Sequence, residues 1–197
     1  MIKGVENVNI LWDFDGTICN TYPSYTKALM ETLGDGHTEE ETLAQLKVSF
    51  GHAFRFFKIS EEQSRKYLQK VRGMKPEEFI PFPGVIDVLR EADCNVIMTH
   101  KEKEDVEKAL RFYNLREFFT EIVGKEDGFP RKPDPESYKY LHEKYGLDLV
   151  IGDRAIDLEP ARRLGIKTVS FQNHESEADF YLDDFREFNS VILPYVK

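Results

Sequence analysis

Residues 8–17 read VNILWDFDGT, and this stretch decides how the rest of the chain is interpreted. It joins an apolar run, residues 8–12, to two carboxylates, Asp13 and Asp15, and a glycine, Gly16. A short apolar run without alternation is typical of a buried strand in a parallel sheet. Two acids at the end of such a strand repel each other and lose hydration, which is costly unless a cation or a proton intervenes. The stretch therefore predicts an α/β fold with chemistry at the end of its first strand.

Apolar runs and helical patterns alternate along the rest of the chain. Strands are predicted over residues 94–98, 121–123, 149–151 and 168–171, and a final strand and helix end over 179–188. Helical spacing of apolar residues lies between them, at 85–89, 106–110 and 138–145. In the third helix, Asp134 is the expected N-cap and Pro135 the expected first residue. The alternation predicts a Rossmann-like α/β fold, with a parallel sheet covered by helices on both faces.

The alternation stops between Thr21 and Phe82, where three helical patterns and no strand are expected. Two capping-box pairs mark helix starts, Thr38 with Glu41 and Ser60 with Gln63. A stripe of apolar residues at helical spacing is interpreted as a core face; its members are Leu43, Leu46, Phe50, Phe54 and Phe57. We therefore predict an α/β core of residues 1–17 and 83–197 with an inserted α-helical cap domain of residues 18–82.

The composition limits the classes of partner. The 27 basic and 36 acidic residues among 197 give a net charge of −9, which argues against nucleic acid and anionic membranes as partners. A small phosphorylated ligand needs only one or two cations and stays possible. No apolar stretch approaches the roughly 20 residues of a membrane span. Two cysteines, Cys19 and Cys94, form no disulfide framework, so a reduced cytoplasmic location is expected, while no oligomeric state is indicated.

Unusual polar residues gather in four segments, residues 12–17, 98–101, 131–134 and 152–157. Three of them follow predicted strands, and ligands of open α/β sheets bind beyond the carboxyl ends of the strands. Asp13, Asp15, Asp153 and Asp157 together offer the hard oxygen ligands that suit Mg²⁺. The sequence therefore predicts a magnesium site at this edge of the sheet.

These segments resemble the motifs of the haloacid dehalogenase-like hydrolase superfamily. The stretch 13–17, DFDGT, looks like its first motif, DxDGT, and Thr99, Lys132 and the pattern 152–157 match the three later motifs in order. The stretches 83–85, 131–135 and 163–166 are similar to the phosphoglycolate phosphatase-like branch. The helical insertion resembles the small cap of that branch. The resemblance spans nearly the whole chain.

The resemblance implies a phosphatase that hydrolyses a small phosphomonoester, such as a phosphoglycolate-like compound or a sugar phosphate. Asp13 would be the nucleophile that forms an aspartyl-phosphate, and Asp15 the general acid and base, able to hold a proton. Mg²⁺ would be held by Asp13, Asp15 through its carbonyl, and Asp153, with Asp157 in support. Phosphate would be bound by Thr99, His100 and Lys132. In the cap, Arg55 and Lys58 are candidate substrate contacts.

Two departures and two alternatives accompany this interpretation. His100 stands where the family commonly has Asn, and it can donate a hydrogen bond to phosphate or to a neighbouring loop, or titrate near neutrality. Asn20 stands where an acid is frequent. A sugar phosphomutase shares the same four motifs and is the nearest alternative. A non-catalytic binding protein on the same scaffold is the more distant one, because fold alone does not prove activity.

Overall fold

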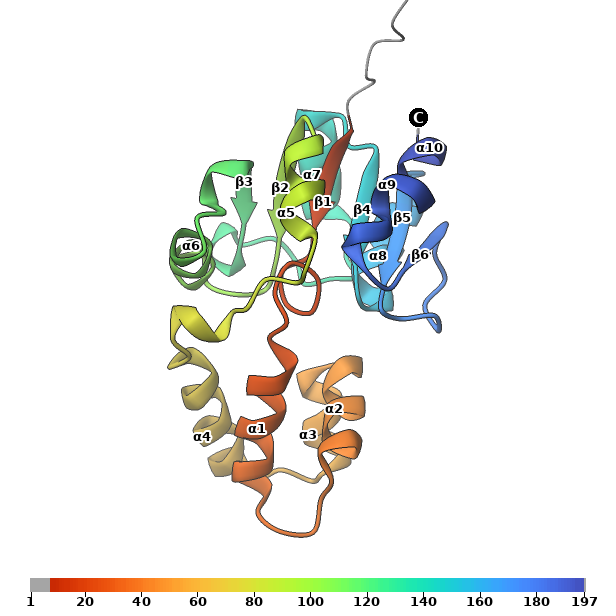
Figure 1. Ribbon diagram of the computed structural model, residues 1–197. Helices are drawn as coiled ribbons and strands as arrows, with labels where there is room; N and C mark the ends of the chain where they lie inside the picture. Colours follow the sequence, from red (N-terminus) through yellow and green to blue (C-terminus); the bar gives the residue numbers. More distant parts are fainter. Residues whose placement is uncertain (1–7, 197) are drawn as a thin grey trace, which may run out of the picture. The chain divides into compact units, whose positions relative to one another are not determined.

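The computed structural model describes residues 8–196, and its centre is a sheet of six parallel strands (Figure 1). The strands lie in the order β3-β2-β1-β4-β5-β6. The chain runs outward from β1 through β2 to β3 and returns to β4 on the other side of β1, so the β1/β4 boundary is the topological switch point. The bounds are β1 Asn9–Trp12, β2 Cys94–Met98, β3 Phe119–Val123, β4 Leu149–Gly152, β5 Lys167–Phe171 and β6 Phe180–Leu182.

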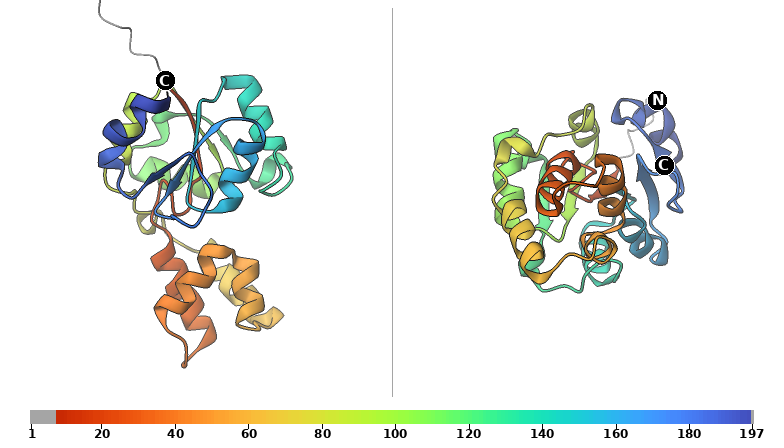
Figure 2. Two further views of the ribbon diagram at one scale, coloured as in Figure 1. Left: turned by 90° about the vertical axis from the view of Figure 1, so that its right-hand side faces the viewer. Right: turned by 90° about the horizontal axis from the view of Figure 1, so that it is seen from below.

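Two helices pack on one face of the sheet, α7 (Glu136–Tyr145) and α8 (Ala155–Arg163). Leu11 of β1 and Val150 of β4 share a buried cluster with Tyr138 of α7 on this face. The four inner strands, β2, β1, β4 and β5, are buried nearly throughout because helices cover their other face as well, as Figure 2 shows. This explains the unbroken apolar runs of the sequence.

The opposite face is tied to α5 (Val85–Glu91) by a buried polar chain. Trp12 Nε1 donates to Asn95 Oδ1 at 2.8 Å, and Asn95 Nδ2 donates to the carbonyl of Leu89 at 2.9 Å. The Trp12 ring also lies 5.6 Å from that of Phe185, just before α9 (Phe188–Val191). The remaining helices of this part are α6 Lys103–Phe112 and α10 Leu193–Val196. The predicted Rossmann-like fold with helices on both faces is confirmed.

The register of the central strands brings their carboxyl ends level. Trp12 pairs with Ile97 of β2 on one side and with Ile151 of β4 on the other. The backbone N–H of Asp13 still donates to the carbonyl of Ile151 at 2.9 Å. The residues that follow these three strands therefore start from one short edge of the sheet.

Two local features differ from the sequence analysis. The helix α8 was not expected, and it forms although Pro160 lies inside it. The helix α7 begins at Glu136, one residue after the expected Pro135. Pro135 is therefore the N-cap residue in place of the expected Asp134, whose Oδ1 accepts from the backbone N–H of Glu136 at 3.0 Å.

The chain divides into two compact units, of which one is Asn20–Ile80 and the other holds the sheet; we call them the helical unit and the α/β unit. The helical unit has four helices instead of the three expected, because Ser49 is extended and its hydroxyl caps the next helix at His52 N. Of the predicted apolar stripe, Leu46 is fully buried in its core and the other four residues are partly buried and pack against that core, so the core interpretation is confirmed. The four helices are α1 Tyr22–Leu33, α2 Glu39–Val48, α3 Phe50–Phe56 and α4 Glu61–Arg72.

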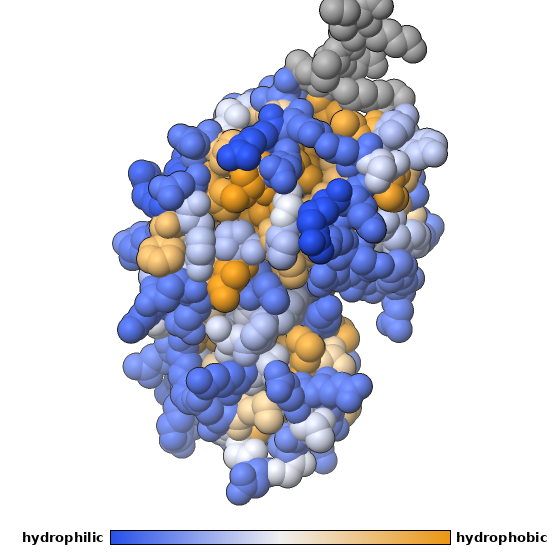
Figure 3. Space-filling model, viewed as in Figure 1, coloured by the Kyte–Doolittle hydropathy of each residue, from blue (hydrophilic) through white to orange (hydrophobic). Residues whose placement is uncertain are grey.

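The surface is largely polar on the face that Figure 3 shows, with smaller apolar areas between the hydrophilic side chains. Within residues 8–196 the longest helices, α1 and α4, have 12 residues each, so none has the length of a membrane span.

Candidate active site

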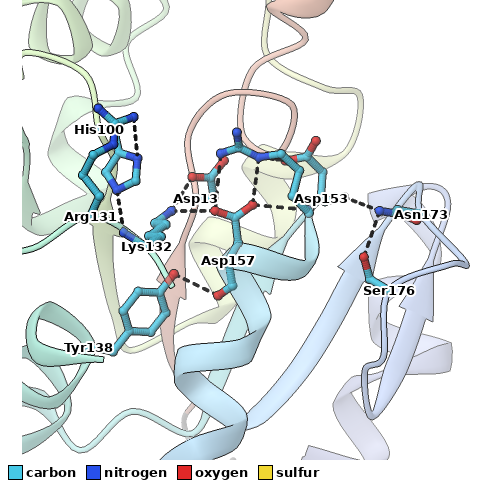
Figure 4. Close-up of polar contacts among 10 residues, drawn as sticks. Asp13, His100, Arg131, Lys132, Tyr138, Asp153, Asp157, Asn173 and Ser176 are labelled. Carbon is cyan, nitrogen blue, oxygen red and sulfur yellow. Dashed lines mark hydrogen bonds and ion pairs between the residues drawn. The ribbon is translucent and has the colours of Figure 1, made fainter. Parts of the chain in front are cut away.

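Four charged side chains are buried together at the carboxyl edge of the sheet (Figure 4). Asp13 follows β1, Asp153 follows β4, Asp157 lies in the first turn of α8, and Lys132 lies on the loop before α7. Each is at most 6% exposed. Buried charges are rare unless they are paired or bind an ion. The predicted convergence of Asp13, Lys132, Asp153 and Asp157 is thus present.

Lys132 forms two ion pairs in this cluster. Its Nζ lies 2.5 Å from Asp13 Oδ1 and 2.9 Å from Asp157 Oδ1. The ammonium also lies 6.0 Å from the centre of the Tyr138 ring, within reach of a cation–π contact. Although burial opposes the charge, the carboxylates of Asp13 and Asp157 raise the pKa of Lys132. It is therefore a fixed positive charge beside Asp13.

Asp157 already uses both of its carboxylate oxygens. Oδ1 accepts from Lys132, while Oδ2 accepts from the backbone N–H of Arg154 at 3.2 Å and from its Nε at 3.3 Å. The Tyr138 hydroxyl donates to the Asp157 carbonyl at 2.8 Å. Burial raises the pKa of Asp157, but Arg154 and Lys132 outweigh it and lower this pKa to about 2. Asp157 therefore holds the two cations in place.

Gly152 is required by this packing. A Cβ added to it would lie 2.5 Å from the Cβ of Asp157, closer than real Cβ contacts. Any side chain at residue 152 would push α8 and its aspartate away from the sheet edge. The presence of glycine at the start of the 152–157 motif thus has a steric explanation.

Asp13 differs from Asp157 in that one of its oxygens is unengaged. Oδ1 pairs with Lys132, whereas the buried Oδ2 has no hydrogen-bond partner among residues 8–196. Burial, and next the charge of Asp157, raise the pKa of Asp13 to about 8. When all three are ionised, the carboxylates of Asp13, Asp153 and Asp157 exceed the two cations Lys132 and Arg154 by one charge. The cluster is therefore one positive charge short.

The donor set fits a small divalent cation. One oxygen each of Asp13, Asp153 and Asp157 lie within 4.8 Å of one another. Carboxylate oxygens are the ligands that Mg²⁺ prefers, and a cation here would favour the charged form of Asp13. Because Asp157 is occupied by Lys132 and Arg154, Asp13 and Asp153 are the better direct ligands.

Thr99 and His100 follow β2 at the same edge. The backbone N–H of Thr99 donates to the Val123 carbonyl at 2.9 Å, and its Oγ1 accepts from the backbone N–H of Lys101 at 3.2 Å. His100 Nε2 accepts from the backbone N–H of Lys132 at 2.9 Å. Burial, followed by Lys132 and Arg131, lowers the pKa of His100 to about 3, so the ring does not titrate near neutrality. A contact of Thr99 or His100 with phosphate stays a prediction.

Asp15 is partly exposed, and its Oδ1 lies 3.9 Å from Lys101 Nζ. The turn after it depends on Gly16, whose φ of 83° is in the left-handed region. Ile18 N and Cys19 N both donate to the Phe14 carbonyl at 3.1 Å, closing this turn. The acid–base role of Asp15 stays a prediction.

Arg55 and Lys58 belong to the helical unit. Arg55 is exposed in α3, and Lys58 follows this helix with a positive φ of 52°. Their substrate contacts stay predictions.

Four further residues shape the site without having been singled out from the sequence. Arg154 and Tyr138 hold Asp157, as described above. Asn173, in the loop after β5, donates from Nδ2 to the Asp153 carbonyl at 2.8 Å and to Ser176 Oγ at 2.9 Å (Figure 4). Arg154 lies inside the 152–157 motif and was findable there, whereas nothing in the sequence marks Asn173, Ser176 or Tyr138.

The chain is similar to known proteins in sequence and in fold. The family model described as haloacid dehalogenase-like hydrolase matches residues 10–171, and the chain belongs to this family. A phosphoglycolate phosphatase of Aliivibrio fischeri is 23% identical, over 93% of this chain and 95% of its own length. Pyrophosphatase PpaX of Bacillus cereus is 27% identical, over 82% of this chain and 81% of its own. A hydrolase from Streptococcus pneumoniae TIGR4, known from a crystal structure, is 34% identical in sequence. It matches this fold with a TM-score of 0.65, over 85% of this chain and 94% of the hydrolase chain.

The prediction of a hydrolase of this superfamily, similar to its phosphoglycolate phosphatase-like branch, is therefore confirmed. The two curated relatives named above are a phosphatase and a pyrophosphatase.

Proposed function

We propose that this protein is a Mg²⁺-dependent phosphatase that hydrolyses a small phosphomonoester through an aspartyl-phosphate on Asp13. One observation carries the proposal: Asp13 Oδ2 is buried and has no hydrogen-bond partner among residues 8–196, while Oδ1 is held by Lys132. A nucleophilic carboxylate needs one oxygen that is not engaged in a hydrogen bond. The family membership and the names of the relatives support the same chemistry.

The first displacement forms a bond between Asp13 Oδ2 and phosphorus and breaks the bond between phosphorus and the ester oxygen. Asp15 gives its proton to the leaving oxygen, so that an alcohol departs. In the second displacement a water oxygen attacks phosphorus, Asp15 accepts the water proton, and the bond to Asp13 breaks. Inorganic phosphate is released, and both aspartates return to their starting state.

Lys132 and the residues at the end of β2 orient the phosphoryl group of the substrate. Lys132, fixed by Asp13 and Asp157, faces the negative charge of the phosphoryl group as a compact ammonium. Thr99 donates its hydroxyl to a phosphoryl oxygen, and His100 lies beside it at the end of β2. In the proposed mechanism these groups meet the charge that develops in each displacement.

Mg²⁺ fits the cluster because the cluster is one positive charge short and Asp13 and Asp153 offer hard oxygens. These two carboxylates and the carbonyl of Asp15 would hold it, with Asp157 in support. When bound, it supplies positive charge that offsets the repulsion between the phosphoryl oxygens and the Asp13 carboxylate.

Substrate choice is assigned to the helical unit, acting as a cap that excludes water from the reaction. Arg55 and Lys58 are its candidate contacts to the part of the substrate beyond the phosphate. The substrate is a small phosphorylated metabolite, of the kind in the name of the phosphoglycolate phosphatase of Aliivibrio fischeri. A cytoplasmic enzyme is consistent with two free cysteines, Cys19 and Cys94.

The test is phosphate release from a panel of phosphoglycolate, hexose phosphates, nucleoside monophosphates and an aryl phosphate. Wild type is compared with Asp13→Asn and with Asp87→Asn, an exposed aspartate as control, each with Mg²⁺ and with EDTA. We expect release that needs Mg²⁺, that Asp13→Asn abolishes and that Asp87→Asn keeps. No release by folded wild type from any ester would refute the proposal, and interconversion of hexose phosphates would point to a phosphomutase instead.

A further inference from the structure

The strongest unassigned feature of the site is a hydrogen bond between two loops that lie 32 residues apart. His100, at the end of β2, accepts from the backbone N–H of Lys132 through Nε2 at 2.9 Å. Figure 4 shows the imidazole beside the backbone of this lysine. Through this bond, the end of β2 is joined to the loop that carries the buried ammonium.

The direction of this bond fixes the state of the ring. A backbone N–H can only donate, so Nε2 must offer a lone pair and the proton of the neutral ring is on Nδ1. Arg131 Nη2 lies 3.4 Å from Nδ1, but a guanidinium has no acceptor and Nδ1 then has no lone pair. The shorter contact with Lys132 is therefore the hydrogen bond. A protonated ring would lose this acceptor.

The surroundings favour the neutral ring. The cations of Lys132, Arg131 and Arg154 act on His100 in the same direction as its burial, and only Asp157 acts against them. Nε2 thus stays an acceptor across the neutral range. The neutral ring of His100 can accept a hydrogen bond from a backbone N–H but cannot supply positive charge to phosphate.

Lys132 needs such an anchor because its side chain is long. An unrestrained lysine side chain loses rotamer freedom when it is ordered. Its Nζ must reach two carboxylates, 2.5 Å from Asp13 and 2.9 Å from Asp157. A displacement of the reacting groups by about 1 Å can reduce rate by about 100-fold. Fixing the backbone at Lys132 sets where its side chain begins.

We infer that His100 is a positioning residue whose Nε2 holds the backbone of Lys132, so that the ammonium stays between Asp13 and Asp157. The inference rests on the proposed function, in which Lys132 faces the phosphoryl group. It assigns to His100 the role of a hydrogen-bond acceptor for the protein itself, rather than that of a donor to the substrate.

The test compares three substitutions of His100 that differ in where the new side chain places a hydrogen-bond acceptor. In His100→Gln the amide reaches the position of Nε2, whereas in His100→Asn it ends near the position of Nδ1 and falls short. His100→Leu has a similar volume and no acceptor. We expect His100→Gln to keep most of the kcat/KM of wild type. His100→Leu and His100→Asn should lose about 10- to 100-fold in kcat/KM and should bind inorganic phosphate more weakly.

The same substitution in a Lys132→Met protein distinguishes the positioning of Lys132 by His100 from a general packing role of the His100 ring. In Lys132→Met there is no ammonium to place, so adding His100→Leu should not weaken the binding of inorganic phosphate, measured by calorimetry with Mg²⁺, any further. An equal further loss in this background would overturn the inference, and so would equal kcat/KM for His100→Leu and His100→Gln. Thermal unfolding of each variant shows that it is folded. Wild type that releases no phosphate would instead overturn the proposed function.

Discussion

The two units of this protein bury different kinds of side chain. At the carboxyl edge of its sheet, the α/β unit buries Asp13, Lys132, Asp153 and Asp157. In the helical unit, residues 20–80, no charged side chain is buried, and the core consists of apolar and aromatic residues such as Leu46 and Tyr67. Buried charge opposes folding unless it is paired, whereas apolar burial favours it. The difference indicates that the α/β unit holds the chemistry, while the interior of the helical unit serves stability.

The largest expected effect comes from removing the buried cation. Lys132→Met leaves Asp13 and Asp157 without their shared partner, and breaking a buried pair in this way costs about 3–5 kcal/mol. We expect this loss in the free energy of unfolding, measured in urea without Mg²⁺. Lys139→Met, an exposed residue of the same unit, is the control and should change little. Equal stability of the two variants would remove the contrast between the units.

The helical unit should respond to a lost apolar contact instead. Leu46→Ala empties a fully buried site in its core and should destabilise this unit by about 2–5 kcal/mol. Urea unfolding monitored by circular dichroism measures this. Val48→Ala, at a residue that is 54% exposed, should stay within about 0.5 kcal/mol of wild type. A loss of less than about 1 kcal/mol at Leu46 would show that this core is loosely packed.

A smaller effect is expected at the start of α4. Ser60 accepts from Gln63 N at 3.2 Å, and Gln63 Oε1 accepts from Ser60 N at 3.0 Å, which completes the predicted capping box. Ser60→Ala should cost about 1 kcal/mol, and Ser60→Asp should restore most of it, because Asp is also a good N-cap. Urea unfolding of the three proteins checks this. If Ser60→Ala and Ser60→Asp were equally destabilised, the cap would not be the cause.

The smallest effect on the free energy of unfolding is expected from removing an ion pair at the surface of the α/β unit. Burial raises the pKa of Glu121, but hydrogen bonds from Lys144, Tyr145 and Tyr140 outweigh it and hold this pKa below its ordinary value of 4.5. A lowered pKa stabilises the fold above pH 4.5, and the contribution is lost as pH falls through the lower folded value. Glu121→Gln should therefore cost less than about 1 kcal/mol at pH 7 and still less at pH 3.

Unfolding of wild type and Glu121→Gln in urea at pH 7, 4 and 3 measures this difference. Glu143→Gln, at an exposed residue whose Oε1 lies 3.7 Å from Lys139 Nζ, is the matched control and should change the free energy of unfolding little. A difference between wild type and Glu121→Gln that grows as pH falls would have the wrong sign for this account.

The amino-acid sequence was sufficient for the order of the strands along the chain and for the acidic residues that meet at the sheet edge. Apolar runs such as 94–98 and 149–151 predicted their strands because buried parallel strands need apolar residues on both faces. The convergence of Asp13 and Asp153 followed from the topology, since the ends of parallel strands share one edge, whereas Lys132 was expected there from the family resemblance. The split of the apolar stripe at Ser49 was missed, because helical spacing continues across a serine that also caps a new helix.

The contacts of the site depend on the folded chain. The structure shows that Asp157 uses both oxygens on Lys132 and Arg154, that Gly152 leaves room for the Asp157 Cβ, and that His100 accepts from a backbone N–H. Each is a fact about which atoms meet in the folded chain. Residue type states what a side chain can donate or accept, but packing selects the partner and the direction. The same holds for Asp13, whose unengaged oxygen comes from where Lys132 and the sheet edge lie.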